Sequence, residues 1–272
     1  MTSSATTQPL RSNADPDAAE RRRIVGEAAT AKLRDDFEHE LGVPYGPHAR
    51  QIFDCYYPTD TSDAPVMVFL HGGGFRQGSP GPVGHYGRPI LDAGGIFVSL
   101  GYRLAPDIRF PDMTEDAELG LDAISEVTAK RGAQSSSLYL SGHSAGAALG
   151  AITALRPQTR VTSALAGLVL VSGMYNFAQQ ADEVSNHGSA RYVPDLTVAI
   201  EHVPPHTIVI AGDRDLPAVM PAAQAMIAAL QKENASIEFF VEEDADHFEA
   251  IRGFATTGSP TSTSVLAMMG LG

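Results

Sequence analysis

The stretch Gly142-His143-Ser144-Ala145-Gly146 places a serine between two glycines, after an apolar run and before a row of small residues. A strand that ends near Leu140 and a helix that starts near Ala145 leave these residues only a tight corner. Such a corner is strained, and strain of this kind favours glycine on both sides of the serine. It also holds the Ser144 hydroxyl above the edge of a sheet, where a base and a substrate can both reach it. We therefore predict that Ser144 is a nucleophile.

Activation of a serine requires a base that takes its proton and an acid that orients the base. His247 follows the apolar run Ile237–Glu242 and is the candidate base. Asp213 and Asp215 both follow the apolar run Thr207–Gly212. Residues just past a strand face the crevice that carries function in open α/β sheets, so both carboxylates are candidates for the acid. Only one of them can orient His247, and the other is expected to be solvated or to cap its loop.

A run of three glycines supplies candidate donors for the oxyanion that forms during acyl transfer. Gly72-Gly73-Gly74 comes directly after His71 and the apolar run Pro65–Leu70. Because no Cβ stands in the way, the N–H groups of Gly73 and Gly74 can turn toward a ligand, and we expect them to be two donors. The N–H of Ala145, at the positive end of the helix that follows the serine, is expected to be the third.

Three apolar or aromatic residues next to these groups are candidates for the walls of a substrate pocket. Phe75 follows the glycines, and Met174 and Tyr175 follow the apolar run Gly167–Gly173. Apolar residues in such places also serve as plain packing, so both interpretations stay open.

The sequence gives no sign of a metal site. His202 and His206 have the spacing of a ligand pair, but Pro204 and Pro205 between them prevent a helix from aligning the two rings. Cys55 is the only cysteine, so it can form no disulfide within the chain and belongs to no thiolate cluster. We expect no metal and no cofactor.

Alternating apolar runs and helical patterns must position the candidate residues. Six short apolar runs predict buried strands: Pro65–Leu70, Gly95–Leu100, Ser137–Leu140, Gly167–Gly173, Thr207–Gly212 and Ile237–Glu242. One more strand is predicted within Val43–Pro58, and helices over Asp17–Leu41, Met113–Lys130, Ala145–Leu155 and Ala218–Lys232. This alternation predicts an α/β fold, with a mainly parallel sheet covered by helices on both faces.

Length and charge limit the organisation and the partners. The 272 residues suffice for one large core, which we place at residues 17–272, after a polar tail at residues 1–16 that we expect to be flexible. The net charge of −13 repels phosphate backbones and anionic lipid surfaces, so neither nucleic acid nor a membrane is an expected partner. No leader-like or membrane-spanning run is present, which makes the cytoplasm the expected location.

These motifs resemble those of the α/β-hydrolase superfamily, in particular the carboxylesterases related to hormone-sensitive lipase and the kynurenine formamidase-like esterases. The runs HGGGFRQGS and GYRLAPDIRFPDMTED are similar to the first group, while VPYGPHARQIFDCYYP and DHFEAI look more like the second. The resemblance runs from about Val43 to the end and implies an α/β-hydrolase fold, in which the short segment Met174–Pro205 would leave a short or minimal cap. It gives Ser144 and His247 their roles in the chain order Ser, Asp, His. The family's Gly-x-x-Asp pattern falls on Gly212 to Asp215 and favours Asp215 as the acid.

The resemblance implies a serine hydrolase that acts on a small-molecule ester or amide, with short-chain or aryl carboxylic esters as the leading substrates. An aryl formamidase or amidase with the same triad is the nearest alternative, and a non-catalytic binding protein of the same fold is another. Two departures bear on the substrate. Formamidase-like members often have an aromatic pair after the glycines, whereas this chain has Gly74-Phe75 and no tryptophan. The segment Met174–Pro205 is short for the cap of the lipase-related members.

The resemblance also covers Arg103 and Asp116, which do not directly follow a predicted strand as the candidate catalytic groups do. We therefore expect these two side chains to be structural. They are predicted to pair and to fix the YRLAP turn, residues 102–106, against the helix that follows it.

Overall fold

One mixed sheet forms the centre of the fold in the computed structural model, which describes residues 16–134, 137–175, 195–197, 200–233 and 235–272. Within these residues the sheet has eight strands in the order β1-β2-β4-β3-β5-β6-β7-β8. The strands are β1 Glu38–Pro44, β2 Ile52–Tyr57, β3 Val66–Leu70, β4 Ile96–Leu100, β5 Leu138–His143, β6 Gly167–Val171, β7 His206–Gly212 and β8 Ser236–Glu242. The expected flexible tail, apart from Pro16, and most of the Met174–Pro205 segment lie outside the described residues.

The strands from β4 to β8 in this order all pair in parallel, whereas β1 with β2 and β2 with β4 pair antiparallel. The prediction of a mainly parallel sheet is therefore confirmed. Parallel strands present their carboxyl ends at the same edge, so the loops after β3, β5, β6, β7 and β8 meet there. β8 lies at one end of the sheet, and its Phe239 and Val241 side chains are exposed.

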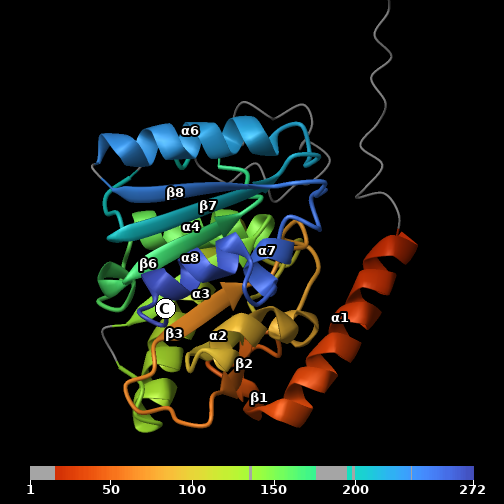
Figure 1. Cartoon of the computed structure of the whole chain (residues 1–272), viewed down its shortest axis with the longest axis vertical. Helices are drawn as coiled ribbons and strands as arrows, with labels where there is room; N and C mark the ends of the chain where they lie inside the picture. The colour runs from red at the N-terminus through yellow and green to blue at the C-terminus, as the bar shows by residue number, and fades with distance from the viewer. Residues whose placement is uncertain (1–15, 135–136, 176–194, 198–199, 234) are drawn as a thin grey trace, which may run out of the picture.

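Helices cover both faces of the sheet, as predicted. The helices are α1 Pro16–Asp36, α2 Arg88–Asp92, α3 Phe110–Lys130, α4 Ala145–Leu155, α6 Val219–Lys232, α7 Arg252–Ala255 and α8 Pro260–Met268, with 3₁₀ turns η1 Gly81–Gly87 and η2 Thr162–Ala164. In Figure 1, α2, α7 and α8 lie on the near face of the sheet and α3 and α4 on the far face. No described helix combines the length and the apolar character needed to cross a membrane.

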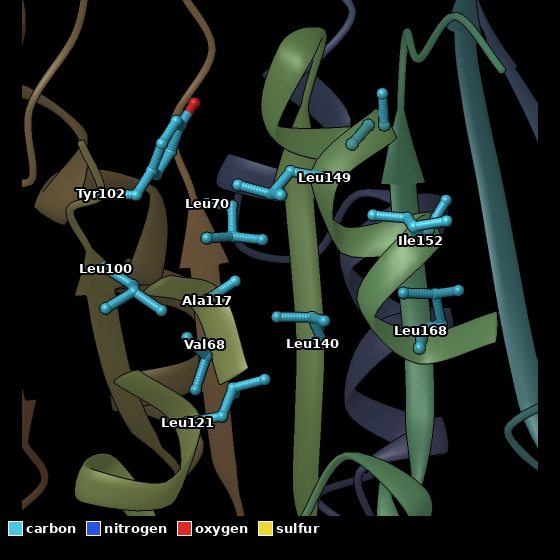
Figure 2. Packing of buried hydrophobic residues seen from close by; sticks show 14 of the residues in the cluster. Val68, Leu70, Leu100, Tyr102, Ala117, Leu121, Leu140, Leu149, Ile152 and Leu168 are labelled. Carbon is cyan, nitrogen blue, oxygen red and sulfur yellow. The ribbon is translucent and has the colours of Figure 1, made fainter. Parts of the chain in front are cut away.

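Successive side chains of each strand point to opposite faces of the sheet, which divides the core into two halves. Val68 and Leu70 of β3 point toward α3 and α4, where they join Leu140, Leu149 and other buried residues (Figure 2). The neighbouring residues Met67 and Phe69 of the same strand belong to the other half of the core, with residues of α1, α2, α7 and α8. Because each central strand is buried on both faces, its sequence reads as a continuous apolar run.

The predicted helix over Asp17–Leu41 is wrong at its end. The helix α1 stops at Asp36, and the strand β1 begins at Glu38 and pairs with β2. A bulge between Glu40 and Val43 contains Gly42 at φ +63°, a conformation that favours glycine. Charged residues on an edge strand resemble the polar end of a helix in sequence, and strand pairing decides between the two.

The predicted pair of Arg103 and Asp116 is present. Arg103 Nη2 lies 2.7 Å from Oδ1 of Asp116, and the backbone N–H of Arg103 donates to Oδ2 over 2.8 Å. The Asp116 side chain is 0% exposed, and it also accepts a hydrogen bond from Gln51 Nε2 over 2.8 Å. Donors from two separate segments thus meet on one buried carboxylate, which ties the turn at residues 102–106 to α3.

Replacing Arg103 with alanine should lower the free energy of unfolding by on the order of 1–4 kcal/mol, because the buried Asp116 loses its counter-ion. Chemical denaturation of the two proteins measures the difference. Arg156→Ala is the matched control, because the pair Arg156–Glu201 is 40% and 56% exposed and should contribute less than about 1 kcal/mol. Equal losses in the two variants would contradict a structural role for the buried pair.

Candidate active site

The loop after β5 places Ser144 at a sharp corner between strand and helix. Ser144 has φ +56° and ψ −118°, and α4 begins at the next residue. A Cβ on Gly142 would lie 2.4 Å from the carbonyl oxygen of Gly146, and one on Gly146 would lie 2.0 Å from that of Leu70. Only glycine fits at either position, since real Cβ contacts are longer. The two glycines therefore allow the strained serine and the close packing of α4 on β3.

A continuous chain of hydrogen bonds joins Ser144, His247 and Asp215. Nε2 of His247 lies 2.8 Å from Oγ of Ser144, and Nδ1 lies 2.7 Å from Oδ1 of Asp215. The side chains of His247 and Asp215 are only 5% and 2% exposed. With Nδ1 protonated toward the carboxylate, the lone pair of Nε2 is free to accept the serine proton.

The structure distinguishes the two carboxylates after β7. Asp215 meets His247, whereas Asp213 is exposed and its Oδ1 accepts the backbone N–H of Ala245 over 3.0 Å. Backbone hydrogen bonds from Asp244 and Ala245 hold the pKa of Asp213 below its usual value. Asp213 therefore caps the loop that leads to His247, as expected of the second carboxylate.

Burial alone would raise the pKa of Asp215. The hydrogen bond and the charge of His247, with further donors, outweigh this effect and place the pKa of Asp215 below its ordinary value. The carboxylate therefore stays ionised beside the ring, where it can stabilise an imidazolium.

The glycine run after β3 lies against the serine corner. A Cβ on Gly72 would lie 3.3 Å from the Cβ of Ser144, which places the loop beside the nucleophile. Within the described residues the N–H groups of Gly73, Gly74 and Ala145 have no hydrogen-bond acceptor. Gly74 is also exposed, so its N–H can reach a ligand that approaches from solvent. The three expected donors are thus available at the edge of the sheet where the parallel strands have their carboxyl ends.

His71 and Tyr102 pack against each other and support this glycine loop. Their rings stack with centroids 4.4 Å apart and planes at 13°, and the Tyr102 hydroxyl donates to the carbonyl of His71 over 2.7 Å. Nδ1 of His71 lies 2.8 Å from the carbonyl of Gly72. Tyr102 precedes Arg103, so the buried pair with Asp116 anchors the segment that supports the loop.

Burial lowers the pKa of His71 to about 4 from a usual value of 6.5. Between these values the unfolded chain binds a proton at His71 that the folded protein does not, so the free energy of unfolding should fall as the pH falls from 6.5 to 4. One such group contributes up to about 1.4 kcal/mol per pH unit. His71→Gln should therefore flatten this slope in urea denaturation curves. A slope in His71→Gln as steep as that of the wild type would refute the prediction.

The three expected pocket residues differ in how deeply they are buried. Phe75 is 4% exposed and packs edge-to-face on Phe110 with ring centroids 5.3 Å apart, and Tyr175 is 0% exposed. Met174 is partly buried against the same half of the core. Burial of the two aromatic rings favours the packing alternative for them, while Met174 keeps an accessible surface. Substrate contact by these residues stays a prediction.

Two neighbours of the site were not among the sequence candidates. Ser172, directly after β6, donates its hydroxyl to Oδ2 of Asp215 over 2.5 Å. His143, inside the serine corner, has its Nε2 2.7 Å from the carbonyl of His247, and burial lowers its pKa to about 4. The rule that residues just past parallel strands face the crevice applies to Ser172 as well and could have found it.

The N-terminal helix also reaches the site. The Arg22 guanidinium of α1 lies 3.6 Å from the ring centroid of Phe248, the residue after His247. Because the helix and the loop are far apart in the sequence, no local pattern predicts this contact.

Comparison with known proteins agrees with this arrangement. A family model described as the alpha/beta hydrolase fold matches residues 67–232. The chain belongs to this family. The expected α/β-hydrolase fold is therefore confirmed, and the matched region of this α/β hydrolase includes the glycine loop, the serine corner and Asp215.

Relatives of this α/β hydrolase include a kynurenine formamidase of Salmo salar, which is 28% identical over 257 residues, or 89% of this chain and 85% of the relative. A carboxylesterase of Mycobacterium tuberculosis is 28% identical over 187 residues, or 61% of this chain and 57% of the relative. The crystal structure of esterase B from Lactobacillus rhamnosis superposes with a TM-score of 0.72, covering 93% of this chain and 91% of that one, at 17% identity. At that identity the likeness supports the fold.

Proposed function

We propose that this α/β hydrolase cleaves short-chain or aryl carboxylic esters through an acyl-enzyme on Ser144. Its class, carboxylic ester hydrolase, is that of its esterase relatives. The observation that carries the proposal is the hydrogen-bonded chain from Ser144 Oγ through His247 to Asp215, with distances of 2.8 and 2.7 Å. A non-catalytic binding protein has no need of this alignment.

In the proposed acylation, Ser144 Oγ attacks the carbonyl carbon while His247 Nε2 takes its proton. The N–H groups of Gly73, Gly74 and Ala145 would stabilise the negative oxygen of the tetrahedral intermediate. The protonated His247 then gives its proton to the leaving alcohol. Water, deprotonated by the same ring, attacks the acyl-enzyme and releases the acid, which restores the Ser144 hydroxyl.

The preference for small acyl groups rests on the surroundings of the glycine loop. Gly74 is exposed, while Phe75 and Tyr175 are buried in the core and, within the described residues, offer little accessible apolar surface beside the loop. A small or flat acyl group needs little apolar surface for binding.

An aryl formamidase is the second candidate, favoured by the formamidase of Salmo salar, whose match covers 89% of this chain. The same residues would serve, with His247 protonating an amine in place of an alcohol. The two candidates thus differ in the leaving group and share the nucleophile.

A side-by-side assay of p-nitrophenyl esters of increasing acyl length and of aryl formamides tests the proposal. We expect kcat/KM to be highest for the short-chain or aryl esters. Higher kcat/KM for the aryl formamides would replace the first candidate by the second. Absence of turnover for both classes in folded protein would reject both.

A further inference from the structure

Ser172 is a buried residue beside the triad that the reaction above leaves without a role. It directly follows β6, is 0% exposed and has φ +51°. That backbone region is uncommon for residues other than glycine, and strained residues of this kind persist where the surrounding structure fixes them. Here the N–H of Ser172 donates to the carbonyl of Ile210 over 2.8 Å, which anchors the strained turn to β7.

The hydroxyl of Ser172 completes the hydrogen bonding of one carboxylate. Oδ2 of Asp215 accepts this hydroxyl over 2.5 Å and the N–H of Gly212 over 3.2 Å. Oδ1 accepts the N–H of Leu216 and faces Nδ1 of His247, both over 2.7 Å. Gly212, the last residue of β7, and Leu216 both lie within three residues of Asp215 in the chain. Ser172 is therefore the donor that connects the carboxylate to a neighbouring strand.

We propose that Ser172 is a positioning residue that fixes the plane of the Asp215 carboxylate and so keeps Oδ1 aimed at Nδ1 of His247. This inference rests on the proposed function of Ser144. Each carboxylate oxygen is held by two donors, so rotation of the group about its terminal bond would break buried hydrogen bonds. Without the Ser172 hydroxyl, Oδ2 keeps one donor, the N–H of Gly212, which lies only three residues before Asp215 in the chain.

The electrostatics of the Asp215–His247 pair agree with this role. Burial by itself raises the pKa of Asp215, and the hydrogen bonds from His247 and Ser172 are among the contacts that lower it again. Within the described residues, His143 and Tyr175 interact electrostatically with this pair, and the exposed Asp246 interacts with His143. Burial keeps the first two uncharged near neutral pH, because it lowers the pKa of His143 and raises that of Tyr175. The hydroxyl thus acts on the charge that orients the imidazole.

The first test replaces Ser172 with alanine and measures kcat and KM on one activated ester. A lost hydrogen bond to a charged group predicts that kcat falls about 10- to 100-fold while KM changes less than about twofold. Ser172→Gly removes the hydroxyl and also relieves the strained φ, so it should fold and show the same loss of kcat. Ser141→Ala is the matched control, since Ser141 is also 0% exposed and its hydroxyl bonds the carbonyl of Val68 over 2.9 Å. It should keep wild-type kcat.

The second test repeats Ser172→Ala in an Asp215→Ala background. If Ser172 acts through the carboxylate, its removal should change kcat there by less than about twofold, because the group it positions is gone. An undiminished loss in that background, or wild-type kcat in the single variants, would overturn the role of Ser172. Turnover that survives Ser144→Ala would instead remove the proposed function, so the two failures are distinguishable.

Discussion

Replacing Ser144 with alanine should reduce ester turnover by on the order of 10⁶-fold, the loss that follows removal of the nucleophile in a serine hydrolase. Alanine keeps the Cβ of serine, so the strained φ of +56° and the packing of the corner are unchanged. A serine-directed phosphonate should label the wild-type protein at Ser144 and leave the variant unlabelled, as measured by intact-protein mass spectrometry.

Circular dichroism and a thermal melt of Ser144→Ala should match those of the wild type, which separates lost chemistry from lost folding. Labelling of a different serine would contradict the assignment of the nucleophile. Unchanged turnover in the purified variant would do so as well.

The second large effect is expected at Asp215. Asp215→Asn should lower kcat on an activated ester by orders of magnitude, about 10⁴-fold in the serine-protease case, because the amide no longer fixes the tautomer or stabilises the imidazolium. A good leaving group reduces the need for proton donation, so the fall on such an ester can be smaller than in the protease case. The ranking of Asp215→Asn against its control is therefore the decisive result.

Asp213→Asn is that control, since Asp213 lies two residues earlier and bonds the backbone of Ala245 over 3.0 Å. Its kcat should stay within about tenfold of the wild type, with the loop held by the remaining amide oxygen. If Asp213→Asn loses more activity than Asp215→Asn, then the assignment of the orienting acid is wrong.

Sequence reasoning reached the parts of this molecule that depend on local pattern. Ser144 sits between glycines that its corner requires, and the Gly-x-x-Asp spacing picked out the carboxylate that meets His247. The positions of the central strands were also predicted correctly, because each strand is buried on both faces and its sequence is therefore continuously apolar.

The parts that sequence reasoning missed depend on contacts across the fold. The end of α1 at Asp36 is decided by the pairing of β1 with β2, which no helical periodicity reveals. Ser172 follows one strand and bonds a carboxylate that follows another, which no local pattern of the sequence indicates. In each case the residue type is compatible with two environments, and tertiary packing selects one of them.

The place of β8 at the end of the sheet has a consequence for heat sensitivity. A terminal strand is paired on one side only, so its fraying costs less free energy than the opening of a central strand. His247 lies on the loop after β8, whereas Ser144 follows β5 in the middle of the sheet. Warming should therefore move His247 reversibly away from Ser144, while Ser144 and the aromatic core keep their positions. The temperature optimum of this enzyme would then lie below its melting temperature and report the fraying of one strand.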